Sequence, residues 1–389
     1  MNYDLASSSW GDEEIQTIQR VIASGHLTMG ENVKRFENEF AQKFGMKYAV
    51  MVSSGSTANL VGVAALFFKK DRPLRRGDEV IVPSISWATT YYPLQQYGLK
   101  LRFLDVELDT LNMDVSQLEQ ALTPQTRMVV AVSVLGNPCA LDVMRKFCDK
   151  HGLYLFEDNC ESMGAELNGK LCGTFGDIGT FSTFFSHHIS TMEGGVLVTD
   201  NTELYHLARS IRAHGWTRDV PDGSTIYDKH DDDFYEAYRF IFPGYNARPL
   251  ELSGAVGVVQ LKKLDAMVAT RRRNAAIFVK LFKGDERFII QRENGKSSWF
   301  AFTVILNPAL DLDRSKIMKA MKQADIGFRI ITGGNFLRHD VIRYFDYECV
   351  GKIRNADIVH DRGFFVGNHP HDVTSQIRHF HEVLVKAAR

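Results

Sequence analysis

The chain has 389 residues, of which 44% are hydrophobic and 24% charged, and its formal net charge at pH 7 is −1. This length predicts a large core divided between two domains, and the balanced charge argues against a surface that binds nucleic acid or a membrane. No apolar run approaches the ~20 residues of a membrane-spanning helix. The first residues lack the basic and apolar regions of a signal peptide, so we expect a cytoplasmic protein.

The cysteines indicate neither a disulfide framework nor a metal centre. There are only five of them, and none forms the CxxC spacing that is typical of zinc ribbons and iron–sulfur clusters. We therefore expect free thiols and no metal site. The five are Cys139, Cys148, Cys160, Cys172 and Cys349.

Two segments near the N-terminus, residues 9–24 and 31–44, carry apolar residues at helical spacing and are each followed by glycine. A predicted strand, residues 48–52, then leads through the sequence SSGSTA into an apolar helix. A strand followed by a Ser/Gly-rich turn and a helix presents free N–H groups and a positive dipole end to an anion. Ser and Thr are also ordinary helix caps, so this turn alone leaves both interpretations open.

Further strands and helices alternate along the chain. The pattern predicts strands at residues 79–83, 100–104, 128–135, 153–156 and 196–199. Alternation of this kind is typical of an α/β fold with a doubly wound, mostly parallel sheet. We predict a large domain over residues 1–250, with an N-terminal helical segment, and a smaller α/β domain over residues 251–389.

Four polar clusters each lie just after a candidate strand. They occupy residues 53–56, 84–87, 158–161 and 182–187. Ligands of doubly wound sheets bind beyond the carboxyl ends of the strands, so these clusters should share one site. Each residue also has a structural explanation when it is considered alone, such as a helix cap, a turn hydroxyl or a core aromatic. Their shared position at one edge favours a functional site.

The last of these clusters belongs to a loop, residues 176–200, with glycines at both ends and two histidines, His187 and His188, between them. Glycine allows sharp turns and close approach of the backbone, so the loop is suited to present a side chain into a cavity. An imidazole can act as a general base near neutral pH.

Six motifs in order, GSTA, SWA, EDNCES, FST, EGG and GYNARPLELSGAVGVVQLKKLD, resemble the sugar aminotransferases of the fold type I, pyridoxal-phosphate class. Members of that family act on nucleotide-linked 4-keto sugars. The resemblance extends from about residue 25 to residue 265, with a family-like C-terminal domain beyond it. It implies an aminotransferase-like fold and a pyridoxal 5′-phosphate or pyridoxamine 5′-phosphate cofactor.

The resemblance assigns roles to individual residues around that cofactor. Gly55, Ser56 and Ser182 would bind its phosphate. Trp87 would stack on its ring, and Asp158 would pair with the pyridinium nitrogen.

Two further assignments concern the ring hydroxyl and the second subunit. Glu161 lies where the family places a polar partner of the ring hydroxyl, usually an amide or an imidazole. Asn246 would reach the phosphate of the neighbouring subunit, which implies a homodimer.

The chain departs from the family at one position. His187 stands where the family has the lysine that binds the cofactor covalently, and no lysine occurs between Lys170 and Lys229. Imidazole has no primary amine, so that bond cannot form, but His187 can still serve as a base. Family members with histidine here are lyases, the 3-dehydratases of dideoxysugar biosynthesis.

The resemblance thus implies removal of the C3 hydroxyl from a nucleotide-linked 4-keto-6-deoxy sugar, with glutamate as amino donor and release of ammonia. One group of these dehydratases uses CDP sugars and an iron–sulfur cluster, which the cysteine spacing here disfavours. The cluster-free group acts on GDP-4-keto-6-deoxy-D-mannose, on the route to colitose of lipopolysaccharide O-antigens. The choice of GDP therefore comes from resemblance only.

Candidate substrate-binding residues are Ser186, His214, Arg218 and Arg248. Either arginine could bind the glutamate carboxylate through paired hydrogen bonds. Two alternatives remain open at this point: a conventional nucleotide-sugar aminotransferase that uses a lysine from elsewhere, and a non-catalytic relative that only binds the cofactor.

Overall fold

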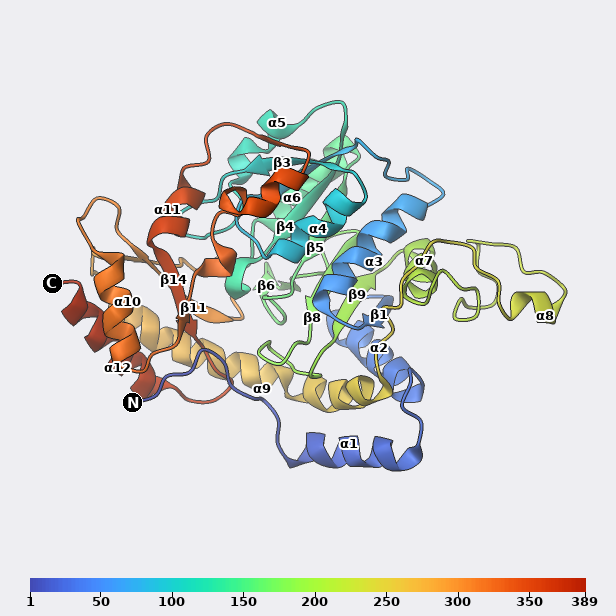
Figure 1. The fold of residues 1–389 in the computed structure, drawn as a ribbon, viewed down its shortest axis with the longest axis horizontal. Helices are drawn as coiled ribbons and strands as arrows, with labels where there is room; N and C mark the ends of the chain where they lie inside the picture. Colours follow the sequence, from blue (N-terminus) through green and yellow to red (C-terminus); the bar gives the residue numbers. More distant parts are fainter.

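An eight-stranded sheet forms the centre of the computed structural model, which describes all 389 residues (Figure 1). β9 pairs antiparallel with both of its neighbours, and the remaining pairs are parallel, so β9 alone runs against the other seven strands. The predicted α/β fold with a mostly parallel sheet is confirmed. In order across the sheet the strands are β1 (Tyr48–Val52), β9 (Gly195–Thr199), β8 (Ile178–Ser182), β5 (Tyr154–Asp158), β4 (Thr126–Val132), β2 (Glu79–Pro83), β3 (Lys100–Leu104) and β13 (Tyr347–Cys349).

Both faces of the sheet are buried, which explains why its strands read as continuous apolar runs. In β2, Val80 and Val82 belong to the core on one face, whereas Ile81 belongs to the core on the other face. Helices cover the two faces. They include α3 (Gly55–Phe68), α4 (Ala88–Gln96), α5 (Leu118–Ala121), α6 (Leu141–His151) and α7 (Thr202–Arg212).

The strand predicted over residues 128–135 ends earlier than expected. β4 stops at Val132, and a short 3-10 turn, Val134–Gly136, follows it. The reason is the backbone of Leu135, which takes a left-handed conformation with φ of 50° and cannot continue a strand. Apolar composition alone does not reveal this turn.

The apolar spacing at residues 250–261, and again from about residue 271, predicts two helices, but the structure has one long helix, α9 (Glu251–Phe282). No glycine or proline interrupts its charged middle, so the helix continues. It packs against α1 (Asp12–Ser24), α2 (Glu31–Phe44) and α12 (Thr374–Ala387). Its first residue, Glu251, accepts hydrogen bonds from the backbone N–H groups of Gly30 and Asn32 at 2.7 and 2.6 Å, which ties α9 to the start of α2.

The C-terminal part contains a second, four-stranded antiparallel sheet. Its strands are β10 (Phe288–Ile290), β11 (Ala301–Leu306), β14 (Gly363–Gly367) and β12 (Phe328–Arg329), and its helices are α10 (Arg314–Gln323), α11 (Asn355–Arg362) and α12. The predicted domain boundary at residue 250 stays a prediction. Each side of this boundary contributes to the other part of the structure. Tyr3, from the N-terminus, packs in the C-terminal core, and β13, from the C-terminal part, extends the large sheet.

The remaining elements are a small hairpin of β6 (Glu166–Leu167) and β7 (Lys170–Leu171), and the short helix α8 (Asp233–Glu236). α8 lies within residues 219–239, where the charged sequence without a clear apolar period predicts a long loop. All five cysteines are free thiols, three of them buried. No group of three or more His, Cys, Asp and Glu side chains is placed to hold a metal ion. None of the helices is both long enough and apolar enough to span a membrane.

Candidate active site

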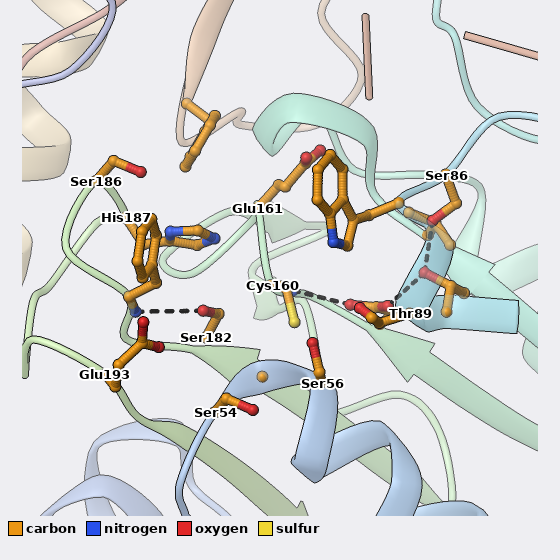
Figure 2. Close-up of a pocket in the computed structure, with 17 residues that line it drawn as sticks. Ser54, Ser56, Ser86, Thr89, Cys160, Glu161, Ser182, Ser186, His187 and Glu193 are labelled. Atoms are coloured by element: carbon orange, nitrogen blue, oxygen red, sulfur yellow. Dashed lines mark hydrogen bonds between the residues drawn. The ribbon is translucent and has the colours of Figure 1, made fainter. Parts of the chain in front are cut away.

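A cavity of about 340 Å³ lies beyond the carboxyl ends of the parallel strands (Figure 2). All four polar clusters that follow the predicted strands contribute to it, so the structure brings them together as expected. The lining residues are Ser54, Gly55, Ser56, Ser86, Trp87, Thr89, Thr90, Val132, Asp158, Cys160, Glu161, Ser182, Phe184, Ser186, His187, Glu193 and Phe300.

The N-terminus of α3 forms the floor of this cavity. Ser54 caps the helix by accepting the Thr57 N–H at 3.1 Å, which leaves the first-turn N–H groups of Gly55 and Ser56 without intrahelical acceptors. A Cβ on Gly55 would lie 2.7 Å from the Ser182 Cβ and 2.8 Å from the Cys160 Sγ. The backbone is therefore packed closely around a turn that can bind an anion.

Asp158 ends β5 and points a buried carboxylate into the cavity. Its Oδ2 accepts hydrogen bonds from Asn59 at 2.8 Å and Thr90 at 2.7 Å, and its Oδ1 accepts the Cys160 N–H at 3.1 Å. All three donors are neutral. A carboxylate has about four acceptor positions, so Asp158 can still accept from a cationic N–H group of a ligand.

Trp87 lies at the rim, immediately before α4. Its side chain is 60% exposed although it is a large aromatic that lines the cavity. Tryptophan is usually well covered in a folded protein. An uncovered indole beside a buried carboxylate is suited to stack on a planar ring.

Glu161 reaches the cavity from the loop after β5. Its Oε2 accepts the Leu135 N–H at 3.0 Å, and its Oε1 makes no hydrogen bond within the protein. Burial raises the pKa of Glu161 to about 7; the Leu135 N–H opposes this shift, and the negative charge of Asp158 adds to it. This carboxyl group therefore binds a proton at a pH where ordinary glutamates are ionised.

His187 is carried by the loop between β8 and β9, and its imidazole points into the cavity (Figure 2). The ring packs edge-on against Phe184 and Phe300, with centroid distances of 5.8 and 5.1 Å. Burial, and after it the charge of Arg271, lower the pKa of His187 to about 4. At neutral pH the ring is uncharged and can accept a proton. No lysine lines the cavity.

His188 does not line the cavity. It is buried behind the wall, where its Nε2 lies 3.3 Å from the Ser298 carbonyl oxygen. The two histidines of the loop are thus distinct: one faces the cavity, and the other packs against the C-terminal part.

The other predicted site residues lie in three different places. Ser182 and Ser186 line the cavity. Arg218, Asn246 and Arg248 line a different cavity of about 250 Å³, where the Arg248 Nε donates to the Asn246 Oδ1 at 3.1 Å. The Arg218 guanidinium lies 5.0 Å from the ring centroid of Trp216.

His214 lines neither cavity. Its N–H donates to the Tyr245 carbonyl oxygen at 2.8 Å, and its φ of 67° places it in a left-handed turn. Within one chain the structure therefore separates His214, Arg218 and Arg248 from His187.

Sequence reasoning missed several residues of the site. Asn59 lies one helical turn after Gly55 on α3, so its position on the same helix face could have indicated a role beside Asp158. Phe300 gave no such signal. It lies more than one hundred residues from His187 in the chain and reaches the cavity only through the fold.

Residues 8–384 match the DegT/DnrJ/EryC1/StrS aminotransferase family. The chain belongs to this family. It is 50% identical to a GDP-4-keto-6-deoxy-D-mannose 3-dehydratase of Yersinia pseudotuberculosis over 388 residues, which cover 99% of each chain. The family membership, the fold and the sequence resemblance agree.

Solved structures of such dehydratases are also similar to this chain. The Escherichia coli GDP-4-keto-6-deoxy-D-mannose-3-dehydratase with bound hydrated PLP superposes with a TM-score of 0.97 at 50% identity, covering 99% of both chains. A GDP-4-keto-6-deoxymannose-3-dehydratase with a trapped PLP–glutamate geminal diamine also gives a TM-score of 0.97 at 50% identity, covering 98% of this chain and all of that one.

We expect Gly55→Ala to weaken the binding of pyridoxal phosphate at least tenfold. The new methyl group would push Ser182 and Cys160 away from the anion-binding turn. Ser56→Ala is the matched control, because it removes one hydroxyl without a steric conflict and should reduce affinity only about two- to tenfold. Titration of the cofactor absorbance measures both. Equal affinities of the Gly55→Ala variant and the unchanged protein would contradict the assignment of this turn.

Proposed function

We propose that the protein is a pyridoxamine-phosphate-dependent 3-dehydratase of a nucleotide-linked 4-keto-6-deoxy sugar, with GDP-4-keto-6-deoxy-D-mannose as substrate and glutamate as amino donor. The observation that carries this proposal is the combination of an aminotransferase-type cofactor cavity with an imidazole, and no lysine, on its wall. The relatives of known activity at 50% identity support the choice of reaction and of nucleotide.

The residues present fit the cofactor. The Gly55–Ser56 turn and the Ser182 hydroxyl suit a phosphate, Trp87 suits a planar ring, and the free acceptor position of Asp158 suits a pyridinium N–H. When bound, the cofactor supplies an amino group and an electron-withdrawing ring, which together make a neighbouring C–H bond acidic. Asp158, with only neutral donors around it, favours the protonated ring that this chemistry requires.

His187 removes the proton of that C–H bond at the cofactor C4′ carbon. Its uncharged imidazole is the form that accepts a proton, and the edge-on packing of Phe184 and Phe300 holds the ring in one orientation. The elimination expels the C3 hydroxyl of the sugar, after which ammonia is released. Glutamate then restores the amino form of the cofactor, with His187 again as the base.

The direct test is mass spectrometry of the products formed from GDP-4-keto-6-deoxy-D-mannose, glutamate and pyridoxal phosphate. We expect a GDP-linked 4-keto-3,6-dideoxy sugar, together with 2-oxoglutarate and ammonia in equal amounts. The corresponding CDP sugar, as a matched control, should give much less product. A GDP-linked amino sugar would show an aminotransferase and contradict the proposal, as would the absence of any reaction.

We further propose a homodimer in which Asn246 reaches the cofactor phosphate of the neighbouring subunit. Asn246 is exposed and lies outside the cavity of its own chain, beside Arg218 and Arg248. These side chains are polar and cationic, as contacts to a phosphorylated ligand require. In such a dimer, Asn246 lies outside the cavity of its own chain but contributes to the cavity of the partner.

Mixed dimers test this proposal. Asn246→Asp and His187→Asn should each be inactive alone, the first because it places a carboxylate against the phosphate. If the two residues serve one site from different subunits, random mixing should restore about a quarter of the activity, since half of the dimers are hybrids with one intact site. No recovery after verified subunit exchange would place Asn246 in its own subunit's site or outside the site altogether.

A further inference from the structure

We propose that Glu161 is the catalytic acid of the dehydration, donating a proton to the departing C3 hydroxyl. This inference rests on the proposed function. The argument depends on where the carboxyl group lies, on what surrounds it and on what the reaction needs.

The surroundings of Glu161 favour a protonated carboxyl. The titratable groups that share its cavity are Asp158 at the end of β5, Cys160 in the loop after it, and His187 and Glu193 from the loop between β8 and β9. None of them is a permanent cation, and the charge that acts on Glu161 is the negative one of Asp158. A desolvated carboxyl group without a cationic partner keeps its proton to a higher pH than an ordinary glutamate, in agreement with its raised pKa.

The geometry leaves one carboxyl oxygen open to a ligand. The N–H of Leu135 donates to Oε2, so Oε1 is the atom available to carry a proton into the cavity. Leu135 takes its left-handed conformation at this point, and its own carbonyl oxygen accepts the Phe300 N–H at 3.0 Å. Backbone outliers of this kind are concentrated at functional sites.

The same Phe300 also contacts the base. Its ring lies against His187, with a centroid distance of 5.1 Å. Phe300 therefore supports the acid through its backbone and Leu135, and the base through its side chain. Glu161 and His187 come from different loops but face one cavity (Figure 2).

The reaction needs such a pair. As the C–H proton passes to the His187 imidazole, the C3–O bond breaks and its electron pair leaves with the oxygen. Hydroxide is a poor leaving group, and uncharged His187 has no acidic proton to give before it acts as base. The proton of Glu161 converts the departing oxygen to water, leaving a carboxylate that is reprotonated from solvent. Two groups in one cavity with pKa values separated in this way are suited to act as base and acid.

The variant Glu161→Gln tests the assignment, because an amide keeps hydrogen-bonding capacity but cannot transfer a proton. The two half-reactions should separate. Conversion of glutamate to 2-oxoglutarate expels no hydroxyl, and in a single turnover its rate should stay within about threefold of the unchanged protein. Dehydration of the keto sugar by the amino form should fall by about a hundredfold or more. The thermal unfolding midpoint serves as the folding control.

Two results with Glu161→Gln would overturn the proposal: dehydration at the unchanged rate, or an equal fall in both half-reactions. If Glu161→Gln does not fold, Glu161→Asp takes its place. In that case, a dehydration rate of Glu161→Asp that equals the rate of the unchanged protein at every pH would overturn the proposal. An equal fall would indicate that Glu161 acts only as a partner of the cofactor. Failure of the unchanged protein to dehydrate any keto sugar would instead contradict the proposed function, so the two failures are distinguishable.

Infrared spectroscopy of the ligand-free protein provides a readout independent of turnover. The spectrum of the unchanged protein minus that of Glu161→Gln should contain the band of a protonated carboxyl at pH 6, and the band should disappear as the pH rises through about 7. The difference is needed because burial also raises the pKa of Glu157 to about 7. Absence of the band at pH 6 would show that Glu161 carries no proton and would exclude it as the acid.

Discussion

The site depends on the close contact between two backbone segments, the turn before α3 and the start of β9. A Cβ on Gly195 would lie 2.2 Å from the Ser54 carbonyl oxygen, so no other residue type fits there without displacing the turn. β9 runs against its neighbours β1 and β8, and this reversal allows the loop that bears His187 to return to the α3 N-terminus. The loop that bears His187 and the turn before α3 are thereby held together by main chain rather than by flexible side chains.

The enclosed cavity also changes the pKa values of two of the side chains that line it. Burial lowers the pKa of His187 to about 4 and raises the pKa of Glu161 to about 7, so that near neutral pH the imidazole is uncharged and a large share of the carboxyl groups still carry a proton. The imidazole of His187 has no primary amine with which to bind a cofactor covalently, but it can accept a proton. The surrounding cavity, with Asp158 and Trp87, retains the features that suit the cofactor ring. A change in reaction can therefore accompany a conserved fold.

Much of this architecture could be predicted from the sequence. The central strands are buried on both faces, so their apolar runs and the polar residues that follow them were visible in the chain, and these residues meet at one cavity. Leu135 and Phe300 could not be predicted, because their roles depend on a left-handed turn and on packing between distant segments. The continuity of α9 was missed because charged residues in its middle resemble a helix boundary, whereas contacts with α2 and α12 stabilise it.

The most direct test of the account is borohydride reduction of the protein loaded with pyridoxal phosphate, followed by intact-mass and peptide analysis. Because an imidazole and no lysine lines the cavity, the account predicts no covalent attachment of the cofactor. A lysine-containing family member should be labelled completely under the same conditions. Recovery of a pyridoxyl-lysine peptide from this chain in proportion to bound cofactor would contradict the central claim.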